Sequence, residues 1–125
     1  MRQFKDKICV ITGAASGIGA ACAHAMASQG AVIVGTDLRA DMLAETKASV
    51  EAEGGKMHTY LVDVADRDAM FDLAAEVEKH HGGADLILNN AGVAFGASVA
   101  EMQLDDLKWL MDVNFWGVVN GTQAF

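Results

Sequence analysis

Proline is absent from the 125 residues, and cysteine occurs only twice, at Cys9 and Cys22. Two cysteines are too few for the disulfide framework that stabilises small secreted domains, so we expect a reducing, cytoplasmic setting. Because no proline is available to shape turns, the 13 glycines must make the tight ones. The glycines are therefore the first guide to where strands and helices end.

Basic residues are also scarce, with 9 Lys and Arg against 17 Asp and Glu and a net charge of -8. An acidic surface repels phosphate backbones, which argues against nucleic acid as a partner. The chain is nevertheless 52% hydrophobic and 21% charged. That composition excludes an intrinsically disordered protein, so we expect a folded globular chain.

Neither a long hydrophobic run nor a set of metal ligands is present. Residues 8–36 carry no Asp, Glu, Lys or Arg, but the continuous apolar run is only 8–11 before Thr12-Gly13 interrupts it. A membrane-spanning helix needs about 20 apolar residues, so we expect no membrane segment and no secretory signal. His80-His81 lacks cysteine or acidic partners at metal spacing, so we expect no metal site.

The chain does contain short apolar segments that alternate with helix-forming segments. The apolar segments predict strands at residues 7–12, 31–36, 56–62 and 84–88. Helices are predicted at residues 18–29 and 39–53, from a cap at Asp66 to Gly82-Gly83, and from Leu104 to the C-terminus. This alternation indicates a Rossmann-type α/β fold, a doubly wound parallel sheet with strand order 3-2-1-4. We expect one domain over residues 1–125.

A glycine-rich turn, TGAASGIG at residues 12–19, joins the first predicted strand to the first predicted helix. Gly13, Gly17 and Gly19 let a ligand approach the backbone closely, and the free N–H groups at the helix start suit a pyrophosphate. The spacing Gly-x-x-x-Gly-x-Gly differs from the common dinucleotide fingerprint GxGxxG. The alternative is a tight turn that binds no ligand.

Acidic residues follow the second and third predicted strands. At the end of the second strand, the Asp37 carboxylate can accept both ribose hydroxyls of an adenosine and would repel a 2′-phosphate. Asp63 ends the third strand and could meet the adenine edge. The alternative for Asp37 is a turn or a cap for the next helix. Since the carboxyl ends of parallel strands share one edge of the sheet, we expect the ligand to bind there.

Taken together, TGAASGIG, Asp37, Asp63-Val64, Asn89-Asn90-Ala91-Gly92 and Asn114 within DVNFWG closely resemble the short-chain dehydrogenase/reductase family. The resemblance covers essentially the whole chain. It implies that Thr12 fixes the turn, that Asp37 holds the adenosine ribose, and that Asp63 with Val64 contacts adenine. The cofactor-binding residues that it implies are Thr12, Gly13, Ser16, Gly17, Ile18, Gly19, Asp37, Leu38, Asp63, Val64, Asn90, Ala91 and Gly92.

The resemblance also bears on which dinucleotide is bound. Relatives that prefer NADP usually carry a basic residue just before the second glycine of the turn or just after the ribose-binding position. Here those positions hold Ser16 and Leu38, which implies NAD(H) in preference to NADP(H). Arg39 lies nearby and leaves some use of both cofactors open.

The last predicted helix carries two stripes. One, Leu107, Met111, Asn114 and Val118, we expect to face the sheet, with a hydrogen-bonded Asn114. By resemblance Asn114 belongs to the family's catalytic tetrad, where it supports a water in the proton relay; the alternative is a purely structural asparagine. We expect the second stripe, Trp109, Val113 and Trp116, to lie in the core or a subunit interface, which predicts a homo-oligomer.

The family's other catalytic residues, a Ser and a Tyr-x-x-x-Lys pair, lie in later segments, and this chain ends at Phe125. Its only tyrosine, Tyr60, has no lysine four residues later. The resemblance therefore implies the NAD(H)-binding N-terminal part of an oxidoreductase, truncated before the later strands. The whole enzyme would transfer a hydride between NAD(H) and an alcohol or ketone substrate. The alternative is a non-catalytic nucleotide-binding or interaction module.

Overall fold

A computed structural model describes residues 3–125 of the chain. Its centre is a four-stranded parallel sheet in the order β3-β2-β1-β4, which confirms the predicted strand order. The strands are β1 (Ile8–Thr12), β2 (Val32–Asp37), β3 (Lys56–Leu61) and β4 (Leu86–Leu88). Each differs from its predicted range by one or two residues at the ends. The sheet is parallel because a helix returns the chain after each of the first three strands.

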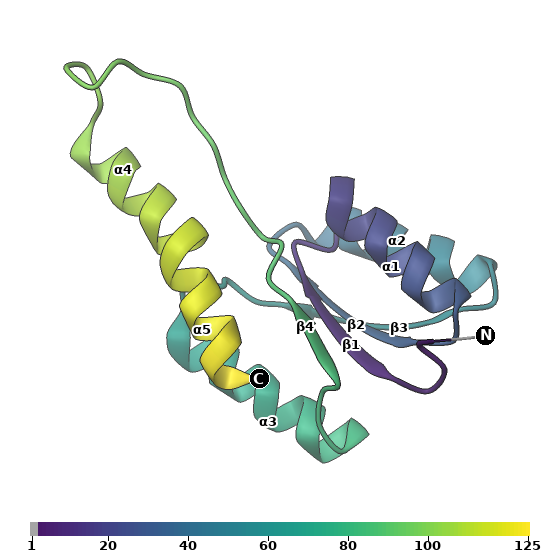
Figure 1. Cartoon of the computed structure of the whole chain (residues 1–125). Helices are drawn as coiled ribbons and strands as arrows, with labels where there is room; N and C mark the ends of the chain where they lie inside the picture. Colours follow the sequence, from purple (N-terminus) through teal and green to yellow (C-terminus); the bar gives the residue numbers. More distant parts are fainter. Residues whose placement is uncertain (1–2) are drawn as a thin grey trace.

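Helices cover both faces of this sheet (Figure 1). On one face lie α1 (Gly17–Ser28) and α2 (Ala40–Ala52). On the other lie α3 (Arg67–His81) and a terminal run composed of α4 (Leu104–Met111), the π-helical turn η1 (Asp112–Trp116) and α5 (Gly117–Ala124). None of the helices within residues 3–125 is long and apolar enough to cross a membrane.

The apolar residues of the strands divide between two cores because successive side chains point to opposite faces of a sheet. In β1, Ile11 packs with Ala23 and Leu43 beneath α1 and α2. Its neighbour Val10 packs on the opposite side with Leu73 of α3. Both β1 residues are fully buried. The continuous apolar runs of the sequence therefore reflect a sheet that is covered on both faces.

Both predicted ends of α3 are confirmed. The Asp66 side chain accepts a hydrogen bond from the Ala69 N–H at 3.0 Å, which satisfies one of the free donors in the first turn. Gly82 ends the helix with φ of 81°, a left-handed conformation that favours glycine. These two ends fix the bounds of the helix that connects β3 to β4.

The buried face of the terminal run differs from the prediction. Leu107, Met111 and Val118 are 38%, 42% and 39% exposed, and Asn114 is exposed too. The buried side instead carries Val113, Gly117, Asn120 and Gly121. The physical reason is close packing at the glycines, since a Cβ on Gly117 would fall 2.6 Å from the Val64 side chain. The prediction placed the stripe with the larger apolar side chains against the sheet, whereas the side with the small residues is the one that packs closely.

Candidate functional site

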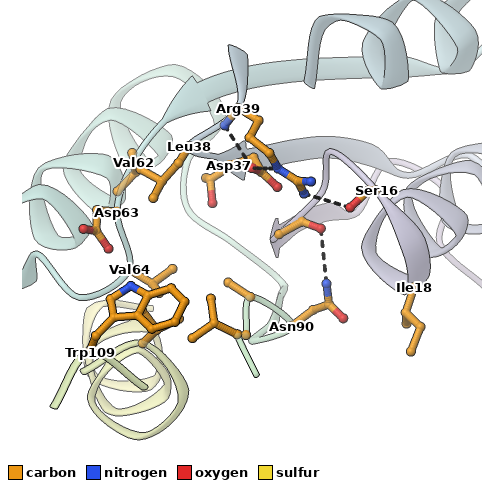
Figure 2. Close-up of a pocket in the computed structure, with 16 residues that line it drawn as sticks. Ser16, Ile18, Asp37, Leu38, Arg39, Val62, Asp63, Val64, Asn90 and Trp109 are labelled. Carbon is orange, nitrogen blue, oxygen red and sulfur yellow. Dashed lines mark hydrogen bonds and ion pairs between the residues drawn. The ribbon is translucent and has the colours of Figure 1, made fainter. Parts of the chain in front are cut away.

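A pocket of about 610 Å³ opens where the strands end at the carboxyl edge of the sheet (Figure 2). This volume is within the range of small-molecule sites. Ten of the residues predicted from the sequence line it, from four separate segments of the chain: Gly13, Ser16, Ile18, Asp37, Leu38, Asp63, Val64, Asn90, Ala91 and Gly92. The remaining predicted residues, Thr12, Gly17, Gly19 and Asn114, are not part of the lining.

Thr12 joins the glycine-rich turn to the end of β4. Its hydroxyl accepts hydrogen bonds from the N–H groups of Asn90 and Ala91, each at 3.0 Å, and donates to the Leu88 carbonyl at 3.4 Å. In return, the Asn90 side-chain amide donates to the carbonyls of Thr12 and Gly13 at 3.1 and 3.2 Å. Thr12 thus holds the pocket-lining residues Asn90 and Ala91 in place without lining the pocket itself. Asn90 lines the pocket and also holds the turn.

The glycines of the turn have different physical roles. Gly13 and Gly17 have φ of 68° and 55°, in the left-handed region that side chains other than glycine rarely adopt. At Gly19 a Cβ would overlap the Gly13 carbonyl oxygen and lie 2.6 Å from the Asn90 amide nitrogen. Gly19 is therefore needed so that α1 can begin close against the turn.

The N-terminus of α1 fits an anionic group. Ser16 precedes the helix, yet within the described residues its side chain caps none of the first helical N–H groups. Its hydroxyl instead accepts a hydrogen bond from Arg39 at 2.8 Å. The first N–H groups of a helix have no partners within the helix and carry the positive end of its dipole. The arrangement leaves those donors for a ligand such as a phosphate.

Asp37 is the buried acidic group of the pocket, and only 9% of it is exposed. One oxygen accepts from the Ala15 N–H at 3.2 Å, and the other accepts from the Arg39 N–H at 3.0 Å and from Arg39 Nε at 3.2 Å. Burial raises the pKa of this carboxyl, but the hydrogen bonds and the Arg39 charge outweigh burial, so its pKa lies below its ordinary value. Asp37 is therefore a fixed negative charge at neutral pH.

Arg39 is a lining residue that the prediction did not include. Its guanidinium lies between Asp37 and Ser16 and hydrogen-bonds to both, as Figure 2 shows. Its position two residues after Asp37 is the signal that could have identified it, because the side chain can fold back on the carboxylate. Arg39 partly neutralises Asp37 and joins the second strand to the glycine-rich turn.

The segment after β3 contributes Asp63 and Val64 to the opposite part of the pocket. Asp63 Oδ1 accepts from the Ala65 N–H at 2.9 Å, which holds the carboxylate in a local turn. Val64 is 6% exposed and packs with Met70 and Val113. This part of the pocket is therefore supported by a packed apolar cluster between α3 and η1.

Asn114 lies in η1 and hydrogen-bonds to both backbone groups of Val93. Its amide donates to the Val93 carbonyl at 2.7 Å, and its side-chain oxygen accepts from the Val93 N–H at 2.8 Å. The prediction that this side chain is hydrogen-bonded is confirmed, although Asn114 is exposed. Since Val93 lines the pocket, Asn114 acts on the pocket by positioning the segment after β4. In the part of the chain that the structure describes, no group of three or more metal-ligating side chains occurs.

These features define an α/β protein of the Rossmann type with a pocket of mixed polar and apolar lining at the carboxyl edge of its sheet. The family model "short chain dehydrogenase" matches residues 7–125. The chain belongs to the short-chain dehydrogenase family. This result confirms the family resemblance inferred from the glycine-rich turn and the residues that follow each strand.

Relatives and solved structures agree with this assignment. The oxidoreductase SadH of Mycobacterium tuberculosis is 40% identical over 125 residues, which is all of this chain and 45% of that protein. A metagenomic short-chain oxidoreductase solved with NADP has a TM-score of 0.93 at 32% identity, covering 98% of this chain and 56% of that one. An NAD+-bound xylitol dehydrogenase has a TM-score of 0.93 at 30% identity, covering 98% and 47%. The chain thus spans about half the length of each of these three proteins.

Proposed function

We propose that this chain binds NAD(H) and forms the cofactor-binding part of an oxidoreductase that transfers a hydride between NAD(H) and an alcohol or ketone. The observation that carries the proposal is the placement of the buried Asp37 carboxylate and the uncapped start of α1 in one pocket. An anion-binding helix end beside a diol-binding carboxylate is what an adenosine diphosphate moiety requires. Membership of a family that binds nicotinamide dinucleotides supports this reading.

We assign the pocket residues to parts of the cofactor as the resemblance implies. Gly13, Ser16 and Ile18, at the turn and the start of α1, would surround the pyrophosphate with backbone donors. Asp37 would hold the adenosine ribose, and Asp63 with Val64 would contact the adenine, with Leu38 as a further cofactor-binding residue. Asn90, Ala91 and Gly92 would lie beside the nicotinamide ribose. Thr12, Gly17 and Gly19 would act indirectly, through the shape of the turn.

The proposal favours NAD(H) over NADP(H). Asp37 is charged at neutral pH and lies against the pocket, so a 2′-phosphate on the ribose would meet like charge. Arg39 moderates this repulsion, but its guanidinium is already hydrogen-bonded to Asp37 and Ser16.

Titration of the chain with NADH and with NADPH tests this preference through the fluorescence of the reduced nicotinamide. We expect tighter binding of NADH, and a smaller difference between the two cofactors in the Asp37→Ala variant. Replacement of Glu53, an acidic residue outside this pocket, by Ala provides the matched control and should leave the preference unchanged. Equal or inverted affinities in the unmodified chain would contradict the assignment.

Bound NAD(H) would supply the hydride donor or acceptor, and this chain's residues would hold and orient it. Of the family's catalytic tetrad, the chain carries Asn114, which positions Val93 at the pocket. Its only tyrosine, Tyr60, packs into the core beneath α3 instead of lining the pocket. We therefore expect the 125-residue chain to bind cofactor without turning over alcohols or ketones, and an NAD(H)-linked absorbance assay tests this.

We further propose that the protein is a cytoplasmic homo-oligomer and that the terminal helical run contributes to the contact between subunits. Phe115 and Trp116 are 50% and 52% exposed, and Leu104 is 67% exposed. Adjacent large apolar side chains on one run of helix mark a surface that another chain can cover. Light scattering over a concentration series tests this contact.

A further inference from the structure

Trp109 lies where neither the sequence pattern nor the family resemblance placed it. The residue belongs to α4 and lines the pocket at the carboxyl edge of the sheet. Figure 2 shows its indole ring beside Val64 and on the same side of the pocket as Asp63, away from Ser16 and Ile18. With 49% of the residue exposed, a large part of the ring is open to a ligand.

The pocket is divided chemically into two ends. The end near the glycine-rich turn offers the polar groups of Ser16 and Asn90. The other end presents apolar side chains from three segments, namely Leu38, Val62, Val64 and Trp109, with the Asp63 carboxylate at its margin. Leu38 is 65% exposed. An apolar end with a single acceptor at its edge suits a flat ring that carries an amino group.

We infer that Trp109 is a binding residue whose indole stacks on the adenine ring of the bound dinucleotide. This inference rests on the proposed function, because it names the group that occupies the apolar end of the same pocket. Every base has a π-face, and an aromatic side chain can stack on it without a specific hydrogen bond. The exocyclic amine of adenine would then be placed toward the Asp63 carboxylate.

The place of Trp109 on the helix is fixed by packing one turn away. One helical turn after Trp109, Val113 is 9% exposed and packs with Val64 and Met70. Residues four apart lie on the same face of a helix. Trp109 therefore lies on the same face of the helical run as Val113, the face that packs against Val64. The backbone that carries the ring is therefore in place before a ligand binds.

The chain contains an internal control for this role. It has two tryptophans, and Trp116 is 52% exposed, nearly the same as Trp109. Trp116 follows seven residues later in the same helical run but does not line the pocket. Its ring instead packs edge-on against Phe115, with centroids 5.0 Å apart. The two side chains are therefore alike in kind and exposure and differ in whether they reach the pocket.

The first experiment uses this pair spectroscopically. In the Trp116→Phe variant, which retains Trp109, we expect AMP to quench the tryptophan emission, because a stacked base quenches an indole. In the Trp109→Phe variant, AMP should leave the emission of Trp116 unchanged. Nicotinamide mononucleotide, which lacks adenine, should quench neither. Quenching of Trp116 by AMP, or of Trp109 by nicotinamide mononucleotide as strongly as by AMP, would overturn the inference.

The second experiment measures affinity. We expect Trp109→Ala to weaken binding of AMP and NADH by roughly 10-fold, the effect of losing one base–aromatic stack. Trp109→Phe should retain most of the affinity, and Trp116→Ala should bind both ligands as the unmodified chain does. Binding of nicotinamide mononucleotide should be the same in all variants. Unchanged AMP affinity in Trp109→Ala would refute the stacking role.

The two proposals fail in different ways. If the unmodified chain binds neither NADH nor AMP, the proposed function itself is wrong, and the adenine assignment is wrong with it. If NADH binds but AMP neither quenches Trp109 nor loses affinity in Trp109→Ala, only the role of Trp109 is wrong. Should Trp109→Ala not fold, as judged by circular dichroism, the emission experiment in the Trp116→Phe variant still decides the question.

Discussion

In β1 and β2 the side chains of Val10, Ile11 and Ile33 are fully buried, whereas Trp109, Phe115 and Trp116 in the terminal helical run are 49%, 50% and 52% exposed. Both regions are rich in large apolar residues. The strands have helices on both faces, but the terminal run packs on one side only, against α3 and the segment around Val64. An apolar pattern therefore predicts burial of all the apolar side chains of an element only where other elements cover both of its sides.

The same comparison separates the two parts of the pocket. The part formed by the glycine-rich turn and β2 is held by hydrogen bonds between neighbouring strand ends, such as those from Asn90 to the turn. The part formed by α4 and η1 depends on the packing of Val113 and on the hydrogen bonds of Asn114 with Val93. We expect substitutions in the first part to affect folding most, and the predictions below test that order.

The largest effect is expected at Gly19. Gly19→Ala would place a Cβ against the Gly13 carbonyl oxygen and 2.6 Å from the Asn90 amide nitrogen, so the free energy of unfolding should fall by about 3 kcal/mol. Gly17→Ala is the matched control. Among residues 3–125, a Cβ there would meet no atom within 4 Å beyond its chain neighbours and the backbone of its own helix. Only its left-handed backbone opposes the change, by about 1 kcal/mol. Urea denaturation of both variants measures the difference, and equal losses would contradict it.

The next effect compares two asparagines of the terminal run. Asn120 is 3% exposed, and its amide donates to the Val64 carbonyl at 2.8 Å. Asn120→Ala leaves that buried carbonyl unpaired, so we expect a loss of about 2 kcal/mol in unfolding free energy. Asn114→Ala should lose only about 1 kcal/mol, because Val93 can hydrogen-bond to water instead. The denaturant midpoints of the two variants measure these losses. A larger loss of unfolding free energy in Asn114→Ala than in Asn120→Ala would contradict the prediction.

A smaller effect is expected from pH, through Asp37. Its pKa is lower in the folded chain than its ordinary value, so folding stability from this group is fully present above about pH 4 and is lost as the pH falls through the folded pKa. The Asp37→Asn variant should lose less stability than the unmodified chain between neutral pH and acid. Thermal melts across that range measure this, and parallel pH profiles would show that Asp37 makes no such contribution.

The smallest effect on folding stability is expected at Trp116. A substitution there should have its clearest effect on self-association. Trp116→Glu places a charge on an exposed apolar surface, so the monomer should fold normally while self-association weakens. Phe71→Glu is the control, since Phe71 is a 40% exposed aromatic on α3. Light scattering over a concentration series of the unmodified chain and both variants tests the contact. An unmodified chain that stays monomeric at high concentration would exclude it.

Most of the fold could be predicted because its signals are local. Apolar runs separated by glycines indicated the strands, and the Asp66 cap and Gly82 marked the ends of α3. The pocket residues that follow each strand were also predictable, since parallel strands bring their carboxyl ends to one edge. Arg39 and Trp109 were missed as lining residues because their roles depend on where long side chains point.

By itself, the sequence determined the α/β class, the strand order and the family, because hydrophobic periodicity and glycine positions are read along the chain. Only the tertiary structure decided which face of the terminal run is buried, since the small Gly117 allows close contact with Val64. It also decided that Asp37 is held between Ala15 and Arg39, and that one tryptophan of two reaches the pocket. Such outcomes depend on contacts between distant segments, which no local pattern encodes.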